Sequence, residues 1–161
     1  MRDLSLLRLS RKAGKAPGLV EYTGEYSVPS KADIITFNEK EFATEHYTDL
    51  HEVKLKENQD VITWYDITGL SSAEAITDFC NRFGIHTLVQ EDLSNNEQLP
   101  KMEDFDQHQF ITLKMLRVDM EKGELLQEHL SILIGRGVVI TFQEKPGDVF
   151  NEIRYRLKNK V

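Results

Sequence analysis

Cysteine and long apolar runs are scarce in this chain of 161 residues. Its one cysteine, Cys80, cannot form a disulfide within the chain. Residues 1–12, MRDLSLLRLSRK, lack the apolar run and small-residue end of a secretory signal. No stretch reaches the roughly 18 consecutive apolar residues that a membrane-spanning helix needs. We therefore expect a soluble chain in a reducing, cytoplasmic setting that does not cross a membrane by itself.

Basic residues are outnumbered as well, because 20 lysines and arginines face 27 aspartates and glutamates and leave a net charge of −7. An acidic domain without a basic stripe repels the phosphates of nucleic acid, so we expect no nucleic-acid partner. Cations are the ligands that this charge favours. The acids gather between residues 86 and 108, where Lys101 is the only lysine or arginine: Glu91, Asp92, Glu97, Glu103, Asp104 and Asp106.

The composition predicts one folded domain behind a basic arm. Residues 1–18 carry five basic residues and one acidic residue, have no sustained apolar period and end at Pro17 and Gly18, so we expect a flexible basic N-terminal arm. The chain as a whole is 40% hydrophobic and 29% charged, which is typical of globular proteins. Residues 19–161 are long enough for a single core, and we expect them to form one domain.

Short β-type runs open this domain. Three of them, at 19–24, 33–38 and 41–48, carry the residue types of strands. The run VITWYDI at 61–67 is β-branched or aromatic almost throughout, which predicts a strand that is covered on both faces and lies centrally in a sheet.

Two helices are predicted next. Ser71 and Glu74 have capping-box spacing, and an apolar face with helical period follows until Gly84 ends the helix. Cys80 belongs to that apolar face. The run HTLVQEDL at 86–93 predicts a second, short helix, which a polar loop ending at Pro100 follows.

The remaining pattern predicts an antiparallel meander over residues 108–142, preceded by a strand at 101–105. Val149, Ile153 and Leu157 then recur every four residues and predict a helix that begins near Asp148. This helical pattern reaches Val161 without a stop signal, so we expect the helix to be cut short and to continue in a longer protein.

No catalytic set is evident, and we expect the protein not to be an enzyme. Cys80 lies on an apolar helix face, where a small core thiol is far commoner than a nucleophile. None of the five histidines is spaced i, i+4 from a second histidine or a cysteine on a helix, so no local motif supports a zinc site. Phosphate-binding glycine patterns are missing too, so no nucleotide cofactor is expected.

Glu91 and Asp92 are the candidate metal ligands. On a helical wheel Asp92 falls between Leu88 and Val89, inside the arc that should be buried, and Glu91 lies at its margin. A carboxylate on that arc is costly unless it meets a cation or a wet interface. Mg²⁺ binds through one or two carboxylates and retained waters, so adjacent acids could supply half a site. The plainer alternative is that Asp92 caps a loop amide or pairs with a lysine.

Five runs in register resemble the cytoplasmic N-terminal domain of the CorA family of magnesium and cobalt channels. Each run alone is weak, but their order and spacing are specific, and the resemblance weakens before Val61. The runs are W-Y-D-I-T-G-L from Trp64, F-G-I-H-T-L-V-Q-E-D-L from Phe83, P-K-M-E-D-F from Pro100, F-I-T-L-K-M-L from Phe110 and I-T-F-Q-E-K-P-G-D-V-F from Ile140.

The resemblance implies an α/β/α sandwich with a central mixed parallel and antiparallel sheet. It also implies a homopentamer on the cytoplasmic face of the inner membrane, reached only through C-terminal helices absent from this sequence. Glu91 and Asp92 match the acids that bind regulatory Mg²⁺, or Co²⁺, at subunit interfaces, shared with an acid of the neighbouring stalk. The binding is expected to be weak and to close the pore.

Some residues depart from the family pattern. Thr87 stands where proline is usual and Leu99 where arginine precedes Pro100, so the loop at 94–99 is expected to differ. The stalk, both membrane helices and the Gly-Met-Asn pore motif are absent. The alternatives are the same domain of a zinc or other divalent-cation transporter, and a free-standing acidic protein-interaction module.

Overall fold

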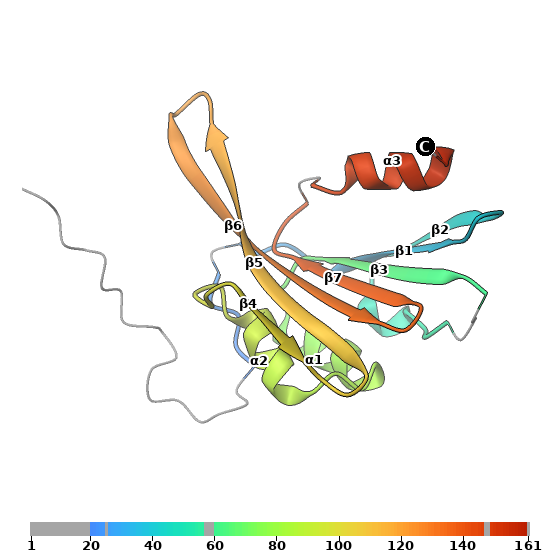
Figure 1. Ribbon diagram of the computed structural model, residues 1–161. Coiled ribbons are helices and arrows are strands. Elements are labelled where there is room, and N and C mark those ends of the chain that lie inside the picture. The colour runs from blue at the N-terminus through green and yellow to red at the C-terminus, as the bar shows by residue number, and fades with distance from the viewer. Residues whose placement is uncertain (1–19, 25, 57–59, 147–148, 161) are drawn as a thin grey trace, which may run out of the picture.

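The computed structural model describes residues 20–24, 26–56, 60–146 and 149–160, and these hold one mixed sheet of seven strands (Figure 1). Its spatial order is β2-β1-β3-β7-β6-β5-β4. The strands are β1 (Lys31–Phe37), β2 (Phe42–Tyr47), β3 (Ile62–Thr68), β4 (Lys101–Asp104), β5 (His108–Asp119), β6 (Glu124–Gly135) and β7 (Val138–Gln143).

β3 is an interior strand, as its sequence predicts. Six of its seven residues are buried, because it pairs with β1 on one side and β7 on the other. The β3–β7 pairing is parallel, with Tyr65 opposite Ile140, while every other pairing between the described strands is antiparallel. β5, β6 and β7 form the predicted antiparallel meander. The one parallel pairing, between β3 and β7, makes the described sheet mixed.

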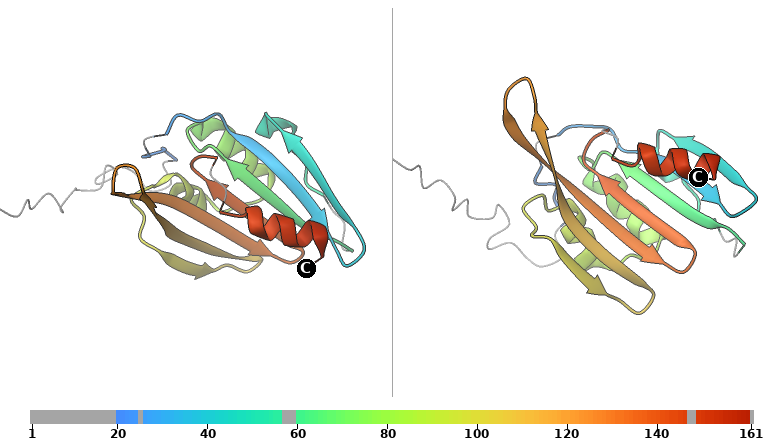
Figure 2. Two further views of the ribbon diagram at one scale, coloured as in Figure 1. Left: turned by 90° about the horizontal axis from the view of Figure 1, so that it is seen from above. Right: turned by 45° about the horizontal axis from the view of Figure 1, so that its top comes forward.

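Helices cover both faces of the sheet (Figures 1 and 2). α1 (Ala73–Arg82) and α2 (Thr87–Ser94) lie on one face, and α3 (Asn151–Asn159) lies over β3 and β1 on the other. A short 3-10 turn, η1 (Leu50–Glu52), contacts α1. The predicted α/β/α sandwich is confirmed.

The core lies between the sheet and the α1–α2 layer. Tyr65 of β3, Phe79 of α1 and Phe142 of β7 are almost wholly enclosed, and the Phe79 ring meets the other two edge-on, with centroids 6.4 and 6.0 Å away. Such pairs add to the stabilisation that burial of aromatic surface already gives. Cys80 is fully buried in the same cluster, so the prediction of a core thiol is confirmed.

Several local predictions need correction. The run at 19–24 was expected to be a strand, but Val20–Gly24 is a loop, because the Thr23 amide donates to the carbonyl of Ser94, the last residue of α2. Ser72, and not Ser71, caps α1: its Oγ accepts from the Ala75 amide at 3.3 Å. Ser71 Oγ donates instead to the Val28 carbonyl at 2.9 Å.

The chain ends were predicted with mixed success. The predicted flexible arm at 1–18 lies outside the described residues, as do Asp148 and Val161 at the two ends of the predicted last helix. α3 itself is shorter than expected, since Lys160 adopts a left-handed conformation (φ 56°) directly after Asn159. None of the described helices has the length and apolar character that a bilayer crossing requires.

Candidate metal site

The predicted ligands line a hollow between α2 and β4. Its volume is about 500 Å³, and its wall on the α2 side includes Glu91 and Asp92. β4 and the residue after it supply the opposite wall. The complete lining is Leu88, Glu91, Asp92, Lys101, Glu103, Asp104 and Phe105.

α2 is held in one orientation by its buried side. Val89 and Leu93 are 0% and 1% exposed and pack into the core. Gln90 is buried as well, and its Nε2 donates to the Ile85 carbonyl at 2.8 Å. Leu88 was expected to be buried but is 52% exposed. The buried face of α2 is therefore centred on Val89, Gln90 and Leu93 and does not include Leu88. Asp92 therefore lies at the edge of that face, next to the hollow.

Asp92 is paired with a lysine of β4. The side chain of Asp92 is 15% exposed, and its Oδ2 lies 2.7 Å from Nζ of Lys101. The same Nζ lies 3.1 Å from Oε2 of Glu103, so one ammonium bridges two carboxylates. The plainer alternative from the sequence, a pairing with lysine, is confirmed.

The pairing with Lys101 opposes the effects of burial and of neighbouring acids on the Asp92 carboxyl. Burial raises the pKa of the Asp92 carboxyl, and the charges of Glu103 and Glu91 add to that effect, while Lys101 opposes it. Burial also disfavours the charge on Lys101, but its hydrogen bonds to Asp92 and Glu103 outweigh burial and raise the pKa of the ammonium. A cation at this point therefore stabilises two acids that would otherwise repel each other.

The sequence singled out Glu91 and Asp92, which line the hollow, but not Lys101 and Glu103, which lie opposite them. β4 pairs with β5 so that Lys101 lies opposite Thr112 and Glu103 opposite Phe110. Directly opposed residues of an antiparallel pair point to the same face, and Thr112 and Phe110 are buried. The i, i+2 spacing of Lys101 and Glu103 was the available signal, because it places both on one face of the strand.

The hollow has oxygen donors but not a complete set of metal ligands. Its donors are carboxylate oxygens, which are the ligands that Mg²⁺ prefers, and a cationic group already fits between two of them. Across the described residues, no three acids, histidines or cysteines are close enough together to enclose a metal ion. The hollow therefore offers part of a coordination shell, with water or another chain left to complete it.

A buried polar network lies close to the end of α2. His129 is 1% exposed, and its Nε2 lies 3.0 Å from Ser131 Oγ while its Nδ1 lies 3.2 Å from Nζ of Lys114. Lys114 Nζ also donates to Oδ1 of Asn96, just beyond α2, at 3.2 Å. His129 is thus a hydrogen-bonded structural histidine.

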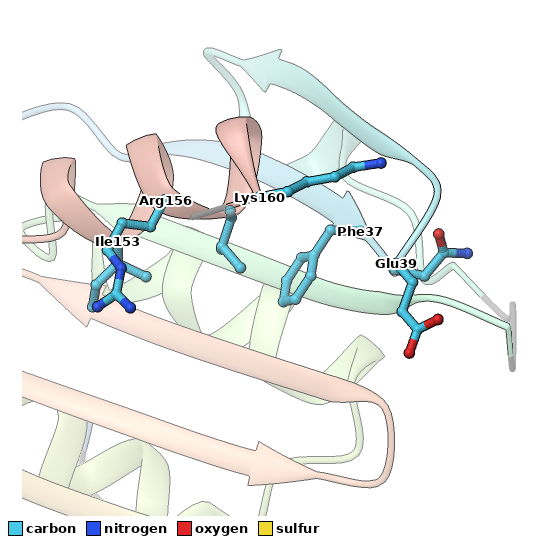
Figure 3. A pocket seen from close by; sticks show the side chains of 7 residues that line it. Phe37, Glu39, Ile153, Arg156 and Lys160 are labelled. Atoms are coloured by element: carbon cyan, nitrogen blue, oxygen red, sulfur yellow. The ribbon is translucent and has the colours of Figure 1, made fainter.

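A second groove runs beneath α3. Figure 3 shows Ile153 and Arg156 of α3 facing the end of β1 at Phe37, with Glu39 and Lys160 nearby. The lining combines apolar side chains with two basic residues, Arg156 and Lys160, and one acid, Glu39. The groove under α3 therefore lacks the cluster of carboxylates that lines the hollow between α2 and β4.

The fold defines the class of the chain, an α/β sandwich built on a mixed sheet, which it shares with domains of known structure. Its fold matches the soluble domain of CorA from Methanocaldococcus jannaschii (TM-score 0.57, 12% identity, 85% of this chain and 49% of that one). It also matches the ZntB cytoplasmic domain from Vibrio parahaemolyticus (TM-score 0.59, 17% identity, 82% of this chain and 51% of that one).

Sequence similarity identifies the family. The family of CorA-like Mg²⁺ transporter proteins matches residues 59–161. The cobalt/magnesium transport protein CorA of Thermotoga maritima is 37% identical over 151 residues, which cover 94% of this chain and 43% of that protein. The chain therefore belongs to the CorA family, as its motifs indicated, and spans less than half the length of this relative.

Proposed function

We propose that this domain is the Mg²⁺-sensing regulatory part of a CorA-type Mg²⁺/Co²⁺ channel. Membership of the family and the similarity to a cobalt/magnesium transport protein support this role. In the proposal the domain works in a homopentamer at the cytoplasmic face of the inner membrane. It closes the pore when Mg²⁺ bridges carboxylates of neighbouring subunits.

The observation that carries the proposal is the bridging of Asp92 and Glu103 by a single ammonium. It supports a site in which two acids depend on a cation, and Glu91 lines the same hollow. A bound Mg²⁺ would supply two positive charges at this place. Asp92 and Glu91 would hold it, with retained waters and an acid of the neighbouring subunit completing the shell.

The regulatory logic follows from charge. With Mg²⁺ bound, repulsion between acids on adjoining subunits is offset and the ring is held together. When Mg²⁺ falls, repulsion returns and the subunits move apart. A ligand shifts such an equilibrium only by its differential affinity for the two states, so the site has to bind weakly, near the cellular Mg²⁺ concentration.

The test requires a channel assembled with this domain. Asp92→Ala is expected to shift inhibition by internal Mg²⁺ to about tenfold higher concentration, since one carboxylate ligand is lost. Transport is measured as Mg²⁺ uptake against internal Mg²⁺. Glu124→Gln, an exposed acid of β6 outside the hollow, is the control and keeps the original dependence. Unchanged inhibition in Asp92→Ala would defeat the proposal.

A further inference from the structure

We infer that Lys101 is a tethered counter-ion that competes with the metal ion and makes the site selective for divalent over monovalent cations. This inference builds on the proposed cation site and adds a specificity-determining residue to it. Lys101 is not itself a ligand of the metal ion, because its ammonium has hydrogen-bond donors and no lone pair to offer.

The position of the Lys101 ammonium makes it a competitor of a metal ion for the Asp92 carboxylate. Nζ of Lys101 lies within 3.1 Å of carboxylate oxygens of both Asp92 and Glu103. A divalent ion bound to Asp92 would be in contact with that ammonium, and like charges at contact repel strongly at a half-buried site. The lysine stem is flexible, and its side chain is 30% exposed, so Nζ can leave toward solvent while β4 stays paired with β5.

Selectivity follows from the exchange that binding requires. A monovalent ion that replaces the ammonium brings no additional charge, and it competes with a group whose tether keeps it beside the acids. A divalent ion brings one additional positive charge to a hollow with several acids. Lys101 therefore excludes K⁺ and Na⁺ and raises the Mg²⁺ concentration needed for occupancy. It also keeps Asp92 compensated when no metal is bound.

The experiment titrates the 161-residue chain with MgCl₂ and CoCl₂ and follows amide chemical shifts of α2 and β4 by NMR, which reports millimolar binding. Lys101→Met removes the ammonium and retains the stem, and is expected to tighten Mg²⁺ binding about tenfold, the combined value of two partly exposed ion pairs. Lys101→Arg keeps the charge and is expected to bind as the wild type does.

Two controls make the result specific. Lys122→Met, in the exposed β5–β6 turn, makes the same change in net charge away from the hollow and should leave affinity in place. Adding Asp92→Asn to Lys101→Met should abolish the gain. With 150 mM KCl present, Mg²⁺ affinity should fall more in Lys101→Met than in the wild type, because K⁺ now enters the hollow.

Equal Mg²⁺ affinity in the wild type and Lys101→Met, or undetectable binding in both, would overturn the inference. The same spectra show whether each variant is folded, and Lys101→Gln replaces Lys101→Met if the latter is not. The proposed regulatory function is judged separately, by Mg²⁺ inhibition of transport in the Asp92→Ala channel. A channel that loses Mg²⁺ inhibition on loss of Asp92, with a domain indifferent to Lys101→Met, would refute only the role of Lys101.

Discussion

His129 is a titratable side chain that the fold keeps neutral. Burial lowers its pKa from 6.5 to about 4, and the charge of Lys114 adds to that effect. Other polar groups surround the residue: its main-chain amide donates to Oε2 of Glu144 at 3.0 Å, and Thr112 Oγ1 lies 3.3 Å from Nε2. Glu144 also accepts from the Tyr22 hydroxyl at 2.7 Å, so protonation of the imidazole would disturb contacts across three segments.

The lowered pKa predicts a defined loss of stability in acid. Between pH 6.5 and about 4 the unfolded chain binds a proton at His129 that the folded chain does not, so the free energy of unfolding falls as the pH drops through this window. The contribution reaches up to about 3 kcal/mol. His129→Gln removes it, and urea unfolding at pH 7, 6, 5 and 4.5 is expected to show a shallower pH dependence than wild type. Parallel curves would contradict the assignment.

Two glycines with positive φ, Gly84 and Gly69, differ in the space around an added side chain, so substitutions there distinguish backbone strain from steric crowding. Gly84 ends α1 at φ +65°, and a Cβ there would meet nothing within 4 Å. Gly69 follows β3 at φ +88°, and its Cβ would lie 2.5 Å from the Pro29 carbonyl oxygen. Gly84→Ala is expected to lower the free energy of unfolding by about 1 kcal/mol, and Gly69→Ala by about 3 kcal/mol, because a clash with main chain adds to the strain. Urea unfolding measures both, and equal losses would show that crowding at Gly69 is relieved.

At the scale of elements, polar and aromatic side chains connect α3 and the residue before it to β3. None of its residues, Asn151–Asn159, is buried. Arg154 forms an ion pair with Asp66 of β3, which is 2% exposed, and its guanidinium lies 5.4 Å from the centre of the Trp64 ring. Phe150 meets the same ring edge-on at 5.2 Å. Burial raises the pKa of the Asp66 carboxyl, while a hydrogen bond from Thr141 and the charge of Arg154 act to lower it.

Loss of Arg154 should therefore detach α3. Arg154→Met leaves the Asp66 carboxylate without its cation and is expected to cost on the order of 2 kcal/mol, less than for a fully enclosed pair because Arg154 is partly exposed. Trp64, the one tryptophan in the chain, reports the change as a red shift of its fluorescence. Adding Asp66→Asn removes the uncompensated charge and should recover part of the stability. An unshifted spectrum in Arg154→Met would show that α3 stays in place.

Elements with a strong local signal were predictable, and elements defined by distant partners were not. β3, α1 and α2 carry their period and end signals within their own residues, and the structure places all three as predicted. The run at 19–24 has strand-like residues, but Thr23 forms hydrogen bonds with the last residue of α2, Ser94, and with Asn96 in the loop that follows. Likewise the choice between Ser71 and Ser72 as cap depends on Val28, which sequence spacing does not bring near.

At the scale of the whole molecule, strand pairing brings together residues that are far apart in the sequence. The parallel β3–β7 pair joins Thr63 to Val138, and the pairing of β4 with β5 brings Lys101 beneath Asp92. The helical wheel could place Asp92 at a partly buried position, because that depends on α2 alone. It could not supply Lys101 or Glu103, because their approach depends on strand order. Half of the acidic hollow was thus predictable from the sequence.

Because the net charge is −7, any added salt screens repulsion between acids, so a specific effect of Mg²⁺ has to be separated from screening. At matched ionic strength, Mg²⁺ at ten times its dissociation constant is expected to add about 1.4 kcal/mol over NaCl, or about 3–6 °C in the unfolding midpoint. Asp92→Asn should lose this increment, whereas Glu124→Gln, with the same change in charge, should keep it. Because NaCl and MgCl₂ screen alike at equal ionic strength, an increment that survives in Asp92→Asn would place Mg²⁺ binding elsewhere on the domain.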